Sequence, residues 1–217
     1  MLSGEHVSVI ATCFACAQAE AQLLAEAMQL HHFSHKSAIA RAGDASTRLF
    51  LILEGMASAD LFSVEGQYAQ LAGYGPGELF GAYPEPTIYR ADIFAVGALT
   101  LLSIDTTAME NLARAHATIA QGLARMMARQ LDMVLDRMAA RIGLSASGRF
   151  HRALLLLADG DGWIRPAPVL SALAIGVNTP RETASRALTA LVRRGIVERH
   201  DDGLRVVSRR LLEDMVV

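Results

Sequence analysis

The sequence predicts an α+β fold in which an N-terminal antiparallel β-roll is followed by one long helix and by a C-terminal group of three helices and a hairpin. Two observations carry this prediction. In the first half of the chain, short apolar segments are separated by glycines about ten residues apart, at Gly43, Gly55, Gly66 and Gly77. Between residues 106 and 143 there is no proline, and apolar residues recur three or four apart. The first pattern is typical of short strands joined by turns, and the second of an amphipathic helix.

The composition is that of a folded protein with one large domain or two small ones. Of the 217 residues, 52% are hydrophobic and 19% are charged, which excludes a disordered chain. No apolar stretch is long enough to span a bilayer, and no export signal begins the chain. We therefore expect a cytoplasmic protein that does not associate with membranes.

Charge is divided unevenly along the chain. Residues 145–217 hold 11 of the 20 basic residues and 8 of the 22 acidic residues, a net charge of +3, which leaves residues 1–144 with a net charge of −5. A basic segment suits a polyanionic partner. If the protein binds nucleic acid, we expect its C-terminal third to do so.

The N-terminal part, residues 1–106, is expected to hold one helix and the β-roll. Residues 9–30 are rich in Ala and Leu and lack Pro and Gly, which predicts a helix. Strands are expected at "LFLIL" (residues 49–53), at the alternating "MASADLFS", and later at "ADIFAV" and "ALTLLSI", with a turn at Glu65-Gly66. Even strand spacing with glycine turns predicts an antiparallel sandwich or a jelly-roll-like β-roll.

Residues 107–143 are expected to form mainly one long helix. Its apolar stripe consists of Ile119, Leu123, Met126 or Met127, Leu131, Val134 and Met138. A stripe of this length fits a second long helix, and a second copy of the chain can supply it in a symmetric homodimer. The alternative is a helix that packs only on its own β domain.

Residues 144–217 have the outline of a winged helix-turn-helix. After the break "GLSASG", helices are expected at "RFHRALLLLAD", "PVLSALAIGV" and "TPRETASRALTALVRRG". The segment "IVERHDDGLRVV" reads as a hairpin with its turn at Asp202-Gly203. Three helices followed by a hairpin are typical of a DNA-binding winged helix-turn-helix.

The third of these helices has a start signal. Thr179 can cap the amide of Glu182, Glu182 can reach back to complete a capping box, and Pro180 suits the first helical position. We therefore expect the helix to begin at Pro180, after a left-handed residue at Asn178. Its buried face is expected to consist of Ala184, Ala187, Leu188 and Leu191, packed on the preceding helix through Leu173, Ala174 and Val177.

Polar residues remain for the exposed side of this helix. In a helix-turn-helix, the N-terminal residues of the second helix reach base edges in the major groove. Arg can bond guanine with two hydrogen bonds, Glu can accept from cytosine, and Ser can bond either a base or a phosphate. The candidate DNA-binding residues are Thr179, Arg181, Glu182, Ser185 and Arg186, with Arg193, Arg194, Arg199 and Arg205 placed for phosphates. The alternative is an ordinary solvated helix with i,i+4 ion pairs.

Several segments resemble the Crp/Fnr family of transcription regulators. "RETASRAL" resembles the family's recognition helix, and "MARQLDMVLDRMAARIGLSASGRF" resembles its dimerisation helix and hinge, including the final Gly148-Arg149 pair. "RAGD", "LILEG", "VEG" and "GPGELFG" resemble its effector-binding β-roll. The resemblance implies a homodimeric, ligand-controlled regulator that binds palindromic double-stranded DNA, and RNA polymerase as well if it activates transcription. The rival interpretation is a ligand-sensing dimeric adaptor whose winged helix binds proteins.

The resemblance also implies a site for a cyclic nucleotide, cAMP or cGMP. The family's phosphate cassette is matched by Gly77, Glu78 and Leu79 and by the pair Arg90-Ala91, and the purine contacts of the dimer helix fall on Val134 and Leu135. Two features depart from the family pattern. The segment "FGAYPEPTIY" is longer and contains two prolines, and Val134 and Leu135 cannot make the hydrogen bonds of the family's Thr and Ser. A cyclic dinucleotide, or a structural Glu-Arg pair in a pocket with another use, remains an alternative.

The remaining chemical motifs are weaker. Cys13 and Cys16 form a Cys-x-x-Cys pair, but an iron–sulfur cluster of the kind found in one branch of the family needs four thiolates and the chain has two cysteines. His31, His32 and His35 are expected to be solvated or capping residues. We expect no metal, no iron–sulfur cluster and, without a nucleophile paired with a base, no enzymatic activity.

Overall fold

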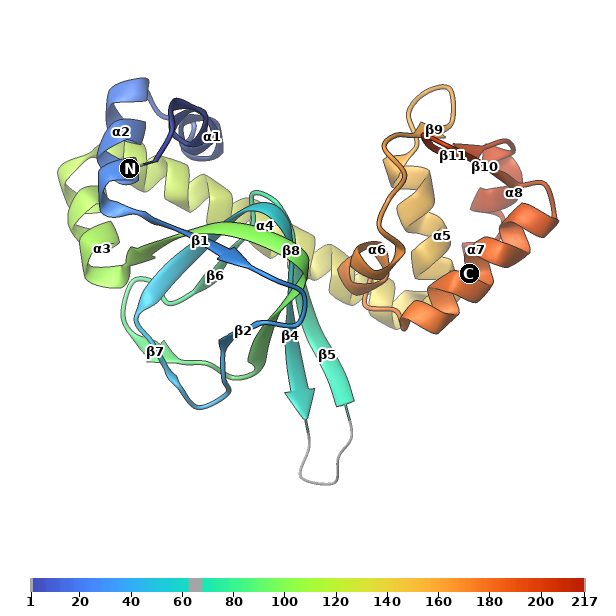
Figure 1. Ribbon diagram of the computed structural model, residues 1–217, viewed down its shortest axis with the longest axis horizontal. Helices are drawn as coiled ribbons and strands as arrows, with labels where there is room; N and C mark the ends of the chain where they lie inside the picture. The colour runs from blue at the N-terminus through green and yellow to red at the C-terminus, as the bar shows by residue number, and fades with distance from the viewer. Residues whose placement is uncertain (1, 63–67, 217) are drawn as a thin grey trace. The chain divides into compact units, whose positions relative to one another are not determined.

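The computed structural model describes residues 2–62 and 68–216 (Figure 1). The predicted turn at Glu65-Gly66 and the "VEG" segment lie outside these residues. The chain divides into two compact units, Met1–Val134 and Leu135–Val217. The predicted α+β class is confirmed, with an antiparallel β domain, a long helix and a C-terminal helical part with a small sheet.

The first unit begins with two helices where one was predicted. Helix α1 (Gly4–Phe14) and helix α2 (Gln18–Ala27) are separated by Ala15, which has a left-handed φ of 48°. The prediction of a single helix over residues 9–30 is therefore wrong. The left-handed Ala15, whose amide donates to the carbonyls of Ala11 and Thr12, ends α1 although neither Gly nor Pro marks the break. The apolar side chains of both helices still enter one core.

The β-roll of the first unit is built around two long antiparallel strands. Its strands are β1 (Gln29–Phe33), β2 (Ala38–Ala40), β3 (Ala45–Ser46), β4 (Arg48–Phe62), β5 (Tyr68–Tyr74), β6 (Leu79–Gly81), β7 (Thr87–Ile88) and β8 (Asp92–Asp105). The main sheet has the order β1-β8-β4-β5, with β2 paired to β8 and β6 to β4, while β3 and β7 form a separate pair. Every one of these pairings is antiparallel, as predicted.

The central strands are longer than the predicted segments. "LFLIL" and the first seven residues of "MASADLFS" fall within β4, and "ALTLLSI" and all of "ADIFAV" except Ala91 fall within β8. Gly55 lies inside β4 with a φ of +82°, where the pairing with β8 shifts register. A Cβ atom there would meet the carbonyl oxygen of Ala98, so this glycine allows two strands to approach closely instead of ending one.

Two apolar clusters fill the first unit. One joins the N-terminal helices to one face of the roll and includes Ile10, Phe14, Leu24 and Leu102. The other fills the inside of the roll, where the rings of Phe50 and Phe80 stack with centroids 4.8 Å apart. Among the described residues, no single helix is long and apolar enough to cross a bilayer; α1 and α2 pass that test only as a pair bent by 110°.

The predicted long helix is divided by His116. Helix α3 (Thr106–Ala115) begins with Asp105, whose side chain caps two backbone amides, and ends at His116, which is extended. Helix α4 (Ala117–Gly143) follows and is the long helix of the prediction. The C-terminal end of α4, from Leu135 onward, belongs to the second unit.

The second unit has the predicted three helices and hairpin. Its elements are α5 (Ala146–Leu157), β9 (Trp163–Ile164), α6 (Leu170–Gly176), α7 (Arg181–Arg193), β10 (Val197–His200), β11 (Gly203–Val206) and α8 (Arg209–Glu213). Strand β9 and helix α8 were not predicted. The hairpin turn is Asp201-Asp202, one residue earlier than predicted, because His200 pairs with Gly203. This arrangement is the winged helix-turn-helix outline, with α6 and α7 as the helix pair.

Candidate nucleic-acid interface and effector site

The N-terminus of helix α7 is not capped in the way predicted. Its N-cap residue is Pro180, no side chain caps the helix, and the first helical residue is Arg181. The side chain of Thr179 is only 4% exposed, and its hydroxyl donates to the carbonyl of Ala146 at 3.1 Å. The predicted capping box of Thr179 and Glu182 is therefore wrong, because a tertiary hydrogen bond takes the hydroxyl that would have capped the helix.

The predicted buried face of α7 is confirmed. Its members Ala184, Ala187, Leu188 and Leu191 are all buried in the core of the second unit. Ala174 of α6 is also buried there. Asn178 has the predicted left-handed conformation, with a φ of 52°, and lies between the two helices.

The opposite side of α7 carries exposed polar residues. Arg181, Glu182, Ser185 and Arg186 are exposed, as are Arg193, Arg194, Arg199 and Arg205 farther along the chain. Within the described residues, Glu182 and Arg186 do not form the i,i+4 ion pair that a simply solvated helix would favour; Arg186 contacts the hydroxyl of Thr183 instead. The arrangement leaves charged donors and an acceptor at the N-terminal end of α7, on a helix anchored by its apolar face.

The Gly77–Leu79 turn lies between β5 and β6. Gly77 has a φ of +80°, and its amide donates to the carbonyl of Ile52 at 2.9 Å. The carboxylate of Glu78 is buried and accepts from the Gly75 amide at 2.6 Å. Leu79 is buried in the core shared with the N-terminal helices. The turn is therefore held rigidly against β4.

Helix α4 contacts this turn through a residue that sequence reasoning missed. The carboxamide of Gln130 accepts from the Leu79 amide at 2.9 Å and donates to the Leu79 carbonyl at 2.6 Å. Two hydrogen bonds thus join one side chain of α4 to the amide and the carbonyl of one residue, Leu79. The only sequence signal was a polar residue between apolar positions of the stripe, which is common on helices.

The other predicted effector residues lie in different settings. Arg90 is exposed two residues before β8, and Ala91, between Arg90 and the strand, is buried in the interior cluster of the roll. Val134 and Leu135 on α4 are exposed, 39% and 54% respectively.

The apolar stripe of α4 changes character along its length. Ile119, Leu123 and Met126 are buried in the core of the first unit. Beyond Gln130 the apolar side chains are exposed: Leu131, Met133, Val134, Leu135, Met138 and Ile142. The alternative of a helix packed only on its own β domain therefore describes the first part of α4 and not the second.

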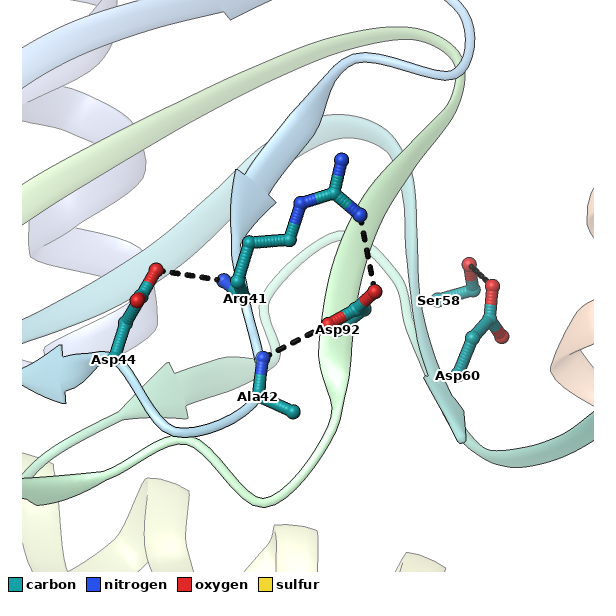
Figure 2. A network of polar contacts seen from close by, with 6 residues as sticks. All are labelled: Arg41, Ala42, Asp44, Ser58, Asp60 and Asp92. Atoms are coloured by element: carbon teal, nitrogen blue, oxygen red, sulfur yellow. Dashed lines mark hydrogen bonds and ion pairs between the residues drawn. The ribbon is translucent and has the colours of Figure 1, made fainter. Parts of the chain in front are cut away.

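A polar network fixes the loop that contains "RAGD" (Figure 2). Asp92 at the start of β8 accepts from the Ala42 amide at 2.8 Å and from the Arg41 guanidinium at 3.0 Å, and Asp44 accepts from the Arg41 amide at 3.2 Å. The Ala42 amide, and then the Arg41 guanidinium, hold the pKa of Asp92 below its usual range. On neighbouring β4, Ser58 donates to Asp60 at 3.0 Å (Figure 2). The contacts with Asp92 anchor the loop that contains the "RAGD" motif to the start of β8.

Each cysteine of the first unit, and each of the three histidines of the predicted group, packs or forms a hydrogen bond separately from the others. Cys13 and Cys16 are free thiols packed against the N-terminal core, and burial raises the pKa of each. The three histidines of the predicted group all bond to β8: His31 to Ser103, His32 to Thr100 and His35 to the Gly97 amide. Within residues 2–62 and 68–216, no group of three or more His, Cys, Asp or Glu residues is arranged to hold a metal ion.

Known proteins resemble this chain both in sequence and in fold. Residues 30–116 match the model of the cyclic nucleotide-binding domain. A cyclic AMP receptor protein from Thermus thermophilus is 34% identical over 182 residues, which cover 80% of this chain and 81% of the relative. FixK2 from Bradyrhizobium japonicum has a similar structure, with a TM-score of 0.70, 18% identity, and coverage of 88% of this chain and 98% of that chain.

A third similar structure is that of CLP, described as a c-di-GMP responsive global regulator, from Xanthomonas campestris. Its TM-score is 0.61 at 16% identity, with coverage of 88% of this chain and 100% of that chain. At such low identity the two structural likenesses concern the fold alone. Crp/Fnr-family regulators bind DNA as dimers and are not enzymes. The identity and coverage of the Thermus relative, together with the fold, establish that the chain belongs to the Crp/Fnr family of DNA-binding transcription regulators.

Proposed function

We propose that the protein reads palindromic duplex DNA as a homodimer, with the α7 helix of each subunit in the major groove. In this proposal residues 1–106 bind an effector, residues 107–143 form the dimer, and residues 144–217 bind DNA. The observation that carries the proposal is α7, where a buried apolar face supports an exposed edge of charged side chains. Two-fold symmetry calls for half-sites about one helical turn apart.

Each exposed residue of α7 has a proposed role. Arg181 and Arg186 bond guanine, Glu182 accepts from the amino group of cytosine, and Ser185 bonds a base or a phosphate. The arginines that neutralise phosphates are Arg193, Arg194, Arg199 and Arg205. Thr179 is buried, so its role in this proposal is to position the helix.

The proposed effector is a cyclic nucleotide, cAMP or cGMP. The exposed guanidinium of Arg90 suits the cyclic phosphate, with Ala91 beside it, and the carboxylate of Glu78 in the Gly77–Leu79 turn suits a ribose hydroxyl. Val134 and Leu135 would contact the purine through apolar surface alone. The match of residues 30–116 to the cyclic nucleotide-binding domain supports this choice of effector class.

One observation favours a second candidate, a regulator of the same family that is not controlled by a cyclic nucleotide. The amides of Gly77, Glu78 and Leu79 already donate, to Ile52, Gly75 and Gln130 respectively. Backbone amides commonly help to hold a phosphate, and in this arrangement Arg90 would have to hold it without those of the turn. The fold itself does not select the effector, because the similar structure of CLP belongs to a c-di-GMP responsive regulator.

Calorimetric titration of the purified protein with cAMP, cGMP and cyclic di-GMP tests the effector. We expect cAMP or cGMP to bind, and Arg90→Ala to weaken binding at least about tenfold because the phosphate loses its charged donor. Arg114→Ala is the matched control, since it removes another exposed guanidinium, which pairs with Glu110 on its own helix. Binding that survives Arg90→Ala would reject the phosphate role, and cyclic di-GMP alone binding would favour the second candidate.

DNA reading is tested by selecting a preferred duplex from a random pool and measuring its affinity. Arg181→Ala and Arg186→Ala should each cost about 1 to 3 kcal/mol and relax the preference at one base position. Affinity should also fall steeply as salt rises, because phosphate contacts release counterions. Arg210→Ala on α8 is the control. Weak binding that is equal for all duplexes, in the parent and in both variants, would instead support a protein-binding adaptor.

A further inference from the structure

The turn that precedes α7 is joined to the segment that follows α4 by a single guanidinium. Arg149 lies near the start of α5 and is half-buried. Its Nε donates to the carbonyl of Val177 at 2.9 Å, one Nη to that of Asn178 at 2.6 Å, and the other Nη to that of Leu144 at 3.1 Å. Arg149 thus bonds three main-chain carbonyls on two separate segments.

These carbonyls belong to two helix ends. Val177 and Asn178 follow α6, and Leu144 follows α4. The last carbonyls of a helix have no partner within it, and a helix C-terminus carries a negative partial charge that favours a cation. Arginine suits the position because its planar fork can serve several acceptors in fixed directions, whereas lysine offers a single point charge. Arg149 therefore caps α4 and α6 together.

Thr179 provides a second bridge between the same two segments. Its hydroxyl lies 3.1 Å from the carbonyl of Ala146 and 3.4 Å from that of Val177. The bridge from Arg149 ends on Leu144, which directly follows α4, and the bridge from Thr179 ends on Ala146, the first residue of α5. On their other side they hold the three residues that lie just before the N-cap of α7.

The bridges act where the apolar core does not reach. Among the described residues of α7, the first buried one is Ala184, so the turn from Arg181 to Thr183 has no buried anchor of its own. Arg181 and Glu182 lie in that turn. Their placement therefore depends on the preceding segment, which Arg149 and Thr179 hold.

We infer that Arg149 and Thr179 are positioning residues for DNA recognition, which hold the first turn of α7 at a fixed place relative to the end of α4. Neither residue contacts DNA. Any displacement of the C-terminal end of α4 would then be carried directly to the residues that read bases. The consequence for DNA rests on the proposed function, whereas the bridging itself is a property of the free protein.

Hydrogen exchange of the free protein tests the bridging without DNA. In Arg149→Met, amides of residues 178–186 should exchange at least about tenfold faster, because three carbonyls lose their donor. Amides in the middle of α5 should be unchanged. Arg152→Met is the matched control: it lies on the same helix and is also half-buried, but its guanidinium pairs with Asp136 at 3.3 Å. Unchanged exchange in Arg149→Met, or the same acceleration in Arg152→Met, would overturn the inference.

Binding to the selected duplex tests the consequence. Arg149→Met and Thr179→Val should each bind it at least about fivefold more weakly, while Thr179→Ser, which keeps the hydroxyl, should bind like the parent. Binding to an unrelated duplex at low salt should not change, because phosphate contacts tolerate small displacements. Equal losses on both duplexes would overturn the positioning role. A parent that prefers no sequence would overturn the proposed function and this consequence, and the exchange data would still decide the bridging.

Discussion

Gly122 lies where α4 passes close to Phe14, the last residue of α1. A Cβ atom at this position would meet the backbone of Phe14, whose carbonyl oxygen is the nearest atom. The obstacle is main chain, so it cannot move aside by a change of rotamer. Phe14 is itself fully buried, which ties the backbone in place. The glycine thus lets two helices of the first unit lie in direct backbone contact.

Gly122→Ala should therefore destabilise the protein, by about 1 to 3 kcal/mol, as expected when atoms are added to a packed core. Gly143→Ala is the control. Gly143 is also in α4, but no atom lies within 4 Å of the position that its Cβ would take. That change should be neutral or slightly stabilising, since alanine favours a helix. Urea unfolding measures both. Similar effects of the two substitutions would show that the contact with Phe14 is not tight.

At the scale of elements, α3 is held to the roll by a hydrogen bond between Tyr83 and Glu110. The Tyr83 hydroxyl donates to the Glu110 carboxylate at 2.8 Å, and Arg114 on the next turn pairs with the same carboxylate. The hydrogen bond from Tyr83, followed by that from Arg114, lowers the pKa of Glu110. Burial and the bond to Glu110 raise the pKa of Tyr83 to about 12. The pair is thus formed by a charged carboxylate and a neutral phenol.

This pair predicts a loss of stability at both ends of the pH range. Because the pKa of Glu110 is lower in the folded state, its contribution is present above the unfolded value and is lost as pH falls through the folded value. Because the pKa of Tyr83 is higher in the folded state, its contribution is present below the unfolded value and is lost as pH rises toward about 12. Tyr83→Phe should weaken both dependences, measured as the change of Tm with pH. Parallel curves for parent and variant would contradict the coupling.

The types and order of most elements could be predicted from the sequence, but their interruptions could not. The roll, α4 and the three C-terminal helices follow from apolar spacing, which reflects the face that each element buries. The breaks at Ala15 and His116 involve neither Gly nor Pro, so no local signal marks them. Conversely, Gly55 looked like the end of a strand and lies within β4, where it serves a close approach to β8.

The candidate DNA interface shows the same limit. The buried and exposed faces of α7 could be predicted, because they depend on residues three and four apart on one helix. The start of α7 could not, because Thr179 bonds to Ala146, which is distant in sequence. The contacts of Gln130 with Leu79 and of Arg149 with Asn178 were missed for the same reason, since each joins a side chain to a backbone group far along the chain. Local sequence patterns do not indicate contacts between residues that are distant in the sequence.

For the whole molecule, the proposed dimer interface is the exposed half of α4. Leu131, Val134, Met138 and Ile142 follow one another three or four residues apart, and Ile142 is 86% exposed. A row of exposed apolar side chains along a helix is unfavourable in water and is typical of a surface that pairs with another helix. The second copy of the chain provides an identical row, so a two-fold axis beside α4 would cover both. Family members bind DNA as dimers, which fits this arrangement.

Leu131→Glu should therefore convert the dimer to a monomer, because the interface would bury two carboxylates close to each other. Arg129→Glu is the matched control: it places the same side chain two residues away, on the opposite and exposed face of α4. Sedimentation analysis at matched concentrations measures the assembly, and circular dichroism checks that each variant is folded. The monomer should also lose most of its affinity for a palindromic duplex, since each subunit then holds one half-site alone and the advantage of two linked contacts disappears. A folded Leu131→Glu variant that remains dimeric would place the dimer interface elsewhere, and the exposed stripe of α4 would then need a different partner.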